Sequence, residues 1–263
     1  MLAVATANVN GVRAAVRRGM GNWLDGARPD ILAVQEVRAP GSVLTEALPG
    51  WALAHEVCEI PGRAGVAVAT KGEVSGVRAG LGLVEAHQTG RWIEADVVIS
   101  GLSEPLTVVS AYVPVGELDS PKQAAKYAFL DAMTKRMGEL AVGGGYAIVC
   151  GDINVAHREA DLRNWRGNIA KRGFLLEERA YIDTWVGEQG WTDVGRVLAG
   201  AVDGPYTWWS WRGKAFDNDA GWRIDCQFAT PGIAALAQSA HVDRAPSYAE
   251  RWSDHAPLVV TYG

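Results

Sequence analysis

Carboxylate and amide side chains follow several apolar runs of this sequence, at places where they could form a reactive site. The clearest case is the run 146–150, which leads through a glycine to Asp152 and Asn154. An apolar run without a 3.6-residue period predicts a buried strand, and the glycines at 143–145 end any helix before it. Because Asp and Asn also close ordinary turns, this stretch alone leaves a turn and a functional site as alternatives.

The same placement of polar residues recurs along the chain. A strand expected over 2–8 ends in Asn8, and the apolar run 31–34 is followed by Gln35 and Glu36. Two β-sheets packed face to face, with helices outside, would collect such strand ends at one edge. The polar residues that we expect at this edge are Asn8, Glu36, Asp152, Asn154, Asp225, Asp254 and His255.

Carboxylates and amides are the donors that a hard cation such as Mg²⁺ prefers, with Mn²⁺ as a substitute. Mg²⁺ binds through one or two carboxylates together with substrate phosphate, so Glu36 helped by Asp254 would suffice. This set predicts hydrolysis of a phosphate ester, in which the metal neutralises developing charge and a base aligns the attacking water. Asp152 is the candidate base.

His255 stands beside Asp254, and Asp225 on another expected strand could orient its ring. A single histidine is more often structural than catalytic, but surrounding carboxylates would raise its pKa and favour an imidazolium that binds phosphate. The structural alternative for Asp225 is a salt bridge with Arg223.

The remaining elements follow from hydrophobic periodicity. A helix over 13–24 would turn Val16, Met20, Trp23 and Leu24 inward, and a helix over 121–140 would carry Lys122, Lys126 and Lys135 on its polar side. Further strands are expected over 65–70, 91–98, 106–113, 205–211, 224–229 and 257–261. No linker rich in Pro, Ser or charge divides the chain, so we expect one domain over 1–263.

Composition bounds the class of protein. The hydrophobic share of 48% and the charged share of 21% are those of an ordinary globular chain. Three widely spaced cysteines without a Cys-x-x-Cys pair favour a reducing, intracellular setting. Neither a signal peptide nor an apolar stretch of membrane-spanning length is visible, so we expect a cytoplasmic protein without a membrane partner.

The charge distribution is uneven. A net charge of −5 argues against a protein that coats nucleic acid without specificity. Segment 158–172 nevertheless holds five basic and two acidic residues, together with Trp165. A solvated loop face is the alternative explanation for such a charge run.

An ordered set of motifs resembles the exodeoxyribonuclease III and apurinic/apyrimidinic (AP) endonuclease family, within the larger endonuclease/exonuclease/phosphatase fold. The motifs are Asn8-Val9-Asn10-Gly11-Val12-Arg13, Leu32-Ala33-Val34-Gln35-Glu36, Gly90-Arg91, Ala111-Tyr112-Val113-Pro114, Gly151-Asp152-Ile153-Asn154-Val155-Ala156-His157, Trp222-Arg223-Ile224-Asp225 and Ser253-Asp254-His255-Ala256-Pro257. The similarity runs nearly from end to end, and the set is far more specific than any one motif.

The resemblance implies an α/β fold, a four-layer αββα sandwich of two packed mixed β-sheets with the site at one edge. It matches Glu36 to the principal metal ligand, with Asn8 and Asp254 nearby. It matches Asp152 to the residue that activates water or protonates the leaving group, and Asn154 to the residue that orients it.

The resemblance also implies contacts with the substrate. Tyr112 and His255 match phosphate-contacting side chains, and Asp225 matches the carboxylate that pairs with His255. Arg91 matches a position near the site with a structural or DNA-contacting role, and Asn10 is expected among the substrate-binding residues.

The substrate that this family implies is duplex DNA with an abasic site or a blocked 3′ end. Trp208 matches the aromatic wall of a pocket for the extruded abasic sugar, whereas alternation turns Trp209 and Trp211 to the other face. Lys122, Lys126 and the basic segment 158–172 would restore a positive surface facing DNA. We expect a monomer that works at the nucleoid.

The sequence departs from the family at Val115, where a polar residue is usual, and the segment 116–126 looks shorter than in some bacterial members. These departures affect the balance of exonuclease and AP endonuclease activity. Two alternatives remain: the same fold acting on an inositol phosphate, a phospholipid or undamaged nucleic acid, and a DNA-binding relative without catalysis.

Overall fold

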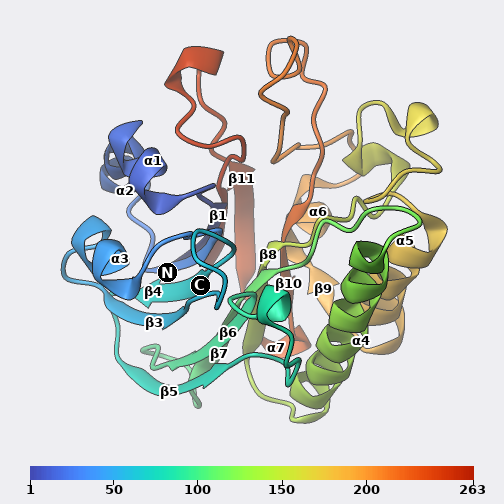
Figure 1. Ribbon diagram of the computed structural model, residues 1–263. Coiled ribbons are helices and arrows are strands. Elements are labelled where there is room, and N and C mark those ends of the chain that lie inside the picture. The colour runs from blue at the N-terminus through green and yellow to red at the C-terminus, as the bar shows by residue number, and fades with distance from the viewer.

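Two six-stranded β-sheets form the centre of the molecule (Figure 1). The computed structural model describes residues 1–263 apart from the side chain of Ala86. The first sheet has the order β11 (Ala237–Val242), β12 (Leu258–Tyr262), β1 (Leu2–Asn8), β2 (Ile31–Gln35), β4 (Val66–Thr70) and β3 (Ala52–Glu56). The second has the order β5 (Val74–Ala79), β6 (Trp92–Val97), β7 (Leu106–Tyr112), β8 (Ala147–Asp152), β10 (Asp225–Ala229) and β9 (Thr192–Asp193).

Alternation along the strands divides the interior into layers. Val66 and Val68 of β4 join one buried cluster with Val108 of β7, which places this cluster between the two sheets. The intervening residues of β4, Ala67 and Ala69, belong to the cluster on the outer face of the first sheet. The predicted sandwich with helices outside is therefore confirmed.

Helices cover the outer faces. Figure 1 shows α1 (Val12–Arg17), α2 (Met20–Ala27) and α3 (Gly41–Ala47) on the side of the first sheet, and α4 (Pro121–Val142) and α5 (Leu176–Asp183) on the side of the second. A π-helical turn, η4 (Thr184–Glu188), continues α5. Short helices complete the chain: α6 (Val194–Ala199), α7 (Pro231–Ala234), η1 (Ala86–Gln88), η2 (Glu159–Asp161), η3 (Trp165–Gly167) and η5 (Tyr248–Glu250).

The long helix α4 begins where its sequence directs. The Ser120 hydroxyl accepts a hydrogen bond from Lys122 N at 3.2 Å, and Pro121 occupies the first turn, where no intrahelical donor is needed. Its buried Phe129, Leu130 and Met133 pack against the second sheet. None of the helices that the structure describes has both the length and the apolar character required to cross a membrane.

Two predicted elements are wrong. The helix expected over 13–24 is two helices, because Gly19 takes a left-handed backbone with φ of 106° between them, and Val16 is consequently 45% exposed. The strand expected over 205–211 does not form. Trp208 makes only isolated bridges with Trp222 and His255, since the next residue, Trp209, turns into its own buried cluster.

Candidate active site

The neighbouring strands β7, β8 and β10 of the second sheet place one polar residue each at the same level of the sheet. In the parallel pairing of β7 with β8, Tyr112 lies opposite Asp152, and in the antiparallel pairing of β8 with β10, Asp152 lies opposite Asp225. Gly151 permits this close pairing, because a Cβ on its backbone, at φ of 152°, would lie 1.9 Å from the Ala111 carbonyl oxygen. The strand-end carboxylates thus occupy one edge, as the sequence predicted.

The first sheet contributes Asn8 and Glu36 to the same edge. The buried Asn8 amide donates to Glu36 Oε1 and to Asp152 Oδ2, each at 2.9 Å, and so joins the two sheets. Glu36 and Asn154 hold positive φ angles of 53° and 52°. Such backbone conformations are rare for residues other than glycine and gather at functional sites.

A metal ion fits between the sheets. One ligand atom each from Glu36, Asp152 and His255 lies within 4.8 Å of the others, and all three residues are buried. Two buried carboxylates are the donors that a hard cation requires. Of the predicted ligands, Glu36 belongs to this group and Asp254 does not, while the role of the Asn8 amide as a ligand stays a prediction.

Asn8 and Asp254 are engaged elsewhere. The Asn8 amide nitrogen faces the two carboxylates, and its oxygen accepts a hydrogen bond from Asn10 N at 3.0 Å. The Asp254 oxygens accept hydrogen bonds from Asn10 Nδ2 at 2.8 Å and from Trp208 Nε1 at 3.1 Å. Although burial opposes the charged form, the charge of His255 and these hydrogen bonds lower the pKa of Asp254. In this arrangement both residues position their neighbours.

His255 is held as a cation. Its Nδ1 lies 2.8 Å from Asp225 Oδ2, and its Nε2 lies 3.8 Å from Asp152 Oδ2. Burial alone would lower the pKa of His255, but the charge and hydrogen bond of Asp225, followed by the charges of Asp152 and Asp254, raise this pKa to about 10. An imidazolium cannot ligate a metal, so the cation site reduces to Glu36 and Asp152, and His255 is free to bind an anion.

The Asp152 carboxyl has an unusual proton affinity. Burial is the main cause that raises its pKa, and the charges of Asp225 and Glu36 add to it, while His255 opposes. Oδ1 accepts a hydrogen bond from Asn154 N at 3.0 Å. The orienting role expected for Asn154 therefore falls to its backbone, since its side-chain amide donates to Val113 O at 2.9 Å. A carboxyl with a raised pKa in a cleft is suited to proton transfer.

Tyr112 and Arg91 form a stacked pair beside the carboxylates. The Arg91 guanidinium lies 4.7 Å from the centre of the Tyr112 ring, and its Nη1 donates to Tyr112 O at 3.3 Å. Burial, followed by the charges of Glu36 and Asp152, raises the pKa of Tyr112 well above its ordinary value. The phenol therefore stays protonated as a hydrogen-bond donor. Arg91 has a structural contact here, and its contact with DNA stays a prediction.

A cavity of about 430 Å³ opens onto these groups. Its polar lining includes Asn10, Glu36, Tyr112, Asp152, Asn154, Asp254 and His255. Its apolar lining comes from Trp208, Trp222 and Ile224, and the two tryptophan rings meet edge to face at 79° with centroids 6.3 Å apart. The structure thus places Trp208 at the cavity, while Trp209 is buried in a separate cluster.

Four polar or charged cavity residues were not named individually as site residues from the sequence, although the last two lie in the basic segment expected to face DNA: Arg38, Asn168, Lys171 and Arg172. Arg38 forms an ion pair with Glu36, two positions earlier in the chain. The surplus of positive charge over 158–172 was the available signal for Lys171 and Arg172. It could not separate them from the other basic residues of the segment, because no periodicity relates these positions.

Lys126 was predicted to face DNA, and this prediction is wrong. Its side chain is fully buried, and Nζ donates to Glu178 Oε1 at 2.7 Å and to Asn154 O at 3.0 Å. Glu178 in turn accepts a hydrogen bond from Gly173 N. The helical period places Lys126 on the polar face of α4. Lys126 is buried there because it forms an ion pair with Glu178, 52 residues away in sequence.

Comparison with known proteins gives consistent matches. A family model described as the endonuclease/exonuclease/phosphatase family matches residues 5–255. An exodeoxyribonuclease of Bacillus subtilis (strain 168) is 29% identical over 252 residues, covering 95% of each chain. An AP endonuclease structure from Archaeoglobus fulgidus has 28% identity and a TM-score of 0.85, covering 100% of this chain and 99% of that one. A 3′ phosphatase structure from Neisseria, bound to a product DNA hairpin, has 28% identity and a TM-score of 0.87, covering 100% of both.

Proposed function

This chain belongs to the endonuclease/exonuclease/phosphatase family, and on that premise we propose that it is a DNA repair nuclease acting on abasic sites and blocked 3′ ends of duplex DNA. The observation that carries the proposal is the meeting of Glu36, Asp152 and His255 at the mouth of a cavity with an aromatic wall. The similar proteins named above are an exodeoxyribonuclease, an AP endonuclease and a 3′ phosphatase.

The cofactor that we propose is Mg²⁺, held by Glu36, with Asp152 beside it left free to transfer a proton. Bound there, Mg²⁺ supplies positive charge that neutralises the phosphate oxygens as negative charge develops. Arg38 pairs with Glu36 on the cavity side, so a metal ion at Glu36 shares this carboxylate with the Arg38 guanidinium or displaces it.

His255 and Tyr112 serve as the protein's donors to the phosphate. His255 Nε2 points toward the carboxylates, while Asp225 fixes the proton on Nδ1. Tyr112 remains protonated and can donate through its hydroxyl. Donors that are already aligned stabilise a charged transition state without reorganising.

Asp152 moves a proton in the hydrolysis. Its carboxyl is fixed by Asn8 Nδ2 on Oδ2 and by Asn154 N on Oδ1. With a raised pKa it can take a proton from water or give one to the leaving O3′. The geometry serves either role equally.

The cavity is the proposed site for an extruded abasic sugar. Trp208 and Trp222 offer an apolar surface to a sugar that has lost its base. Extrusion of such a nucleotide costs less than extrusion of a paired one, and this difference favours damaged over intact DNA. The cytoplasmic location and the monomeric state stay predictions.

The proposal is tested with the purified protein on matched substrates. We expect cleavage of a duplex with one synthetic abasic site and removal of a 3′-phosphate, loss of both activities in EDTA, and recovery with Mg²⁺ or Mn²⁺. The undamaged duplex of the same sequence is the control. An intact abasic duplex at every Mg²⁺ concentration, together with hydrolysis of a phosphoinositide, would replace this function with a phosphatase acting on lipid.

A further inference from the structure

We propose that Lys171 and Arg172 form a subsite for the extra negative charge of a 3′-terminal phosphate monoester, which makes this end the substrate that the cavity selects. Both residues line the same cavity as Glu36, Asp152 and His255. The inference rests on the proposed nuclease function and specifies its substrate class.

The charges of Lys171 and Arg172 are available to a ligand. Their segment carries three other cations, and each has a contact of its own. Arg158 pairs with Asp183 at 2.7 Å, Arg163 lies 3.9 Å from Asp203, and Arg166 stacks on Trp165. Among the side chains that the structure describes, no carboxylate lies within ion-pair distance of Lys171 or Arg172.

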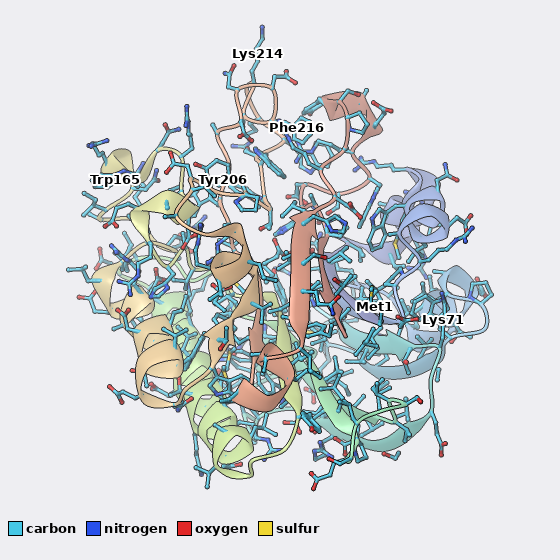
Figure 2. The ribbon with its side chains drawn as sticks, turned by 180° about the vertical axis from the view of Figure 1, so that it is seen from behind. Met1, Lys71, Trp165, Tyr206, Lys214 and Phe216 are labelled. Carbon is cyan, nitrogen blue, oxygen red and sulfur yellow. The ribbon has the colours of Figure 1, made fainter. Side chains whose placement is uncertain are left out.

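Part of segment 158–172 is a solvated loop face, which was the alternative explanation for its charge. This part includes Trp165 and Arg166. Figure 2 labels Trp165, the ring on which Arg166 stacks, at the periphery of the molecule, among side chains that project outward. Arg166 is exposed and does not line the cavity. Lys171 and Arg172, although also exposed, line the open cavity that they share with the reactive carboxylates.

The backbone that carries the two cations is fixed. Arg172 Nη1 donates to Gly116 O at 3.3 Å, and the next residue, Gly173, donates through its backbone N to Glu178 Oε2 at 2.5 Å. Glu178 is fully buried and paired with Lys126. Gly173 O also accepts a hydrogen bond from Ala156 N at 2.8 Å. The backbone that carries the subsite is therefore held in place, so an anion that binds there need not order it.

Gly173 brings this backbone close to the catalytic loop. Its φ is 82°, and a Cβ on it would lie 3.2 Å from both Asn154 O and a ring carbon of Trp222. Asn154 O is the same oxygen that accepts from Lys126 Nζ at 3.0 Å. One buried ion pair thus holds the Asp152 to Asn154 turn and the Lys171 to Gly173 segment together.

Charge distinguishes the candidate substrates. A backbone phosphodiester carries one negative charge, whereas a phosphate monoester carries close to two at neutral pH. An abasic nucleotide presents a neutral sugar to the cavity, while a 3′-phosphate presents a free oxyanion there. Two unpaired cations stabilise the second far more than the first.

The reaction at such an end is ordinary hydrolysis. The oxygen of water bonds to phosphorus as water gives up one proton, the P–O3′ bond breaks with its electron pair on O3′, and O3′ takes a proton, so that no net proton is consumed. The products are inorganic phosphate and a 3′-hydroxyl. The additional negative charge stays on the phosphoryl oxygens throughout, within reach of the cavity cations.

The test compares the double variant Lys171→Ala/Arg172→Ala with wild type on three hairpin duplexes: one ending in a 3′-phosphate, one with an internal abasic site and one ending in a 3′-hydroxyl. We expect kcat/KM for 3′-phosphate removal to fall about tenfold to thirtyfold, and abasic cleavage to fall less than about threefold. Lys171→Arg/Arg172→Lys, which keeps both charges, should retain the selectivity. Lys135→Ala removes one positive charge from the exposed face of α4 and should change neither rate by more than about twofold.

A binding measurement in EDTA separates recognition from catalysis. By fluorescence anisotropy, wild type should bind the 3′-phosphate hairpin about tenfold tighter than the 3′-hydroxyl hairpin, and the double variant should lose most of this preference. Equal losses on all three substrates would overturn the subsite and assign the cations to general contact with the DNA backbone. Retained cleavage with lost selectivity would leave the proposed nuclease function standing, whereas a wild type that cleaves none of the three would refute that function itself.

Discussion

Arg223 and Asp225 are separated by one residue, yet they belong to buried charge clusters of opposite character. Arg223 Nε donates to Asp161 Oδ1 at 2.7 Å, and its Nη2 donates to Asp193 Oδ2 at 2.6 Å. Arg196 adds a second guanidinium to Asp161. Burial alone would raise the pKa of Asp161, but the charges of Arg223 and Arg196 lower it to about 2. Every carboxylate of this cluster has a permanent cation.

In the cluster around Asp225, the carboxylates outnumber the cations. Asp225 and Asp152 share one imidazolium, His255, and Glu36 stands close to Asp152 through the amide of Asn8. The pKa of Asp152 is raised, chiefly by burial, where that of Asp161 is lowered. Carboxylates that are each paired with a guanidinium therefore stabilise the fold. Where carboxylates outnumber the cations, one of them can bind a proton and the group can bind a metal cation.

The largest effect on the first cluster should come from Arg223→Met. It leaves Asp193 buried without its guanidinium, so we expect a loss of about 3–5 kcal/mol in the free energy of unfolding. Urea unfolding measures this loss. Under conditions where the variant is folded, its nuclease rate should stay within about twofold of wild type. If the variant is as stable as wild type but cleaves more slowly, the Arg223 cluster contributes to catalysis and is not purely structural.

His255→Gln should act in the opposite way. It removes the cation shared by Asp225 and Asp152, and we expect kcat to fall about 100-fold because one aligned donor to the phosphate is lost. Circular dichroism serves as the check that the variant is folded. A decrease below about tenfold would show that the imidazolium is structural.

Acid titration measures how much the paired Asp161 carboxylate contributes to stability. Because the folded pKa of Asp161 lies below its unfolded value of 3.8, the stability from this carboxylate is present above pH 3.8 and is lost as pH falls toward 2. A shift of this size corresponds to about 2 kcal/mol. Urea unfolding of wild type and Asp161→Asn across pH 5 to 2 should show an acid-dependent loss that is larger in wild type by about 2 kcal/mol, because other carboxylates such as Asp254 also have lowered pKa values. Parallel pH curves would contradict the pairing.

Trp208 and Trp209 extend the comparison to adjacent uncharged side chains. Trp208 lines the cavity and donates to Asp254, while Trp209 is buried against Phe216. We expect Trp208→Ala to reduce abasic-site cleavage about tenfold, because the wall of the sugar pocket is lost, and to affect 3′-phosphate removal less. Equal losses on both substrates would remove the pocket-wall role.

The sequence predicted the sheets and much of the site for one physical reason. Asn8, Glu36 and Asp152 each follow an apolar run, Asp225 begins the strand 225–229, and the strand register then aligns them. Tyr112 and Trp208 were reached only through the family resemblance, since neither stands out by composition or spacing.

The sequence could not predict features that depend on distant partners. Lys126 follows the helical period of an exposed face, but Glu178 draws it into the interior. Val16 is exposed because Gly19 divides the expected helix into two. Segment 205–211 forms no strand, and its backbone pairing is limited to isolated bridges of Trp208 with Trp222 and His255. Such outcomes are set by tertiary packing, which overrides local propensity.

The most direct test of the account is single-turnover cleavage of a duplex with one abasic site, in Mg²⁺, by Asp152→Asn and Asp161→Asn. Both changes remove one buried carboxylate charge, one from each cluster. We predict that Asp152→Asn lowers the rate about 1,000-fold with an unfolding free energy within about 1 kcal/mol of wild type, and that folded Asp161→Asn keeps the wild-type rate. An Asp152→Asn variant that cleaves within tenfold of wild type would contradict the account.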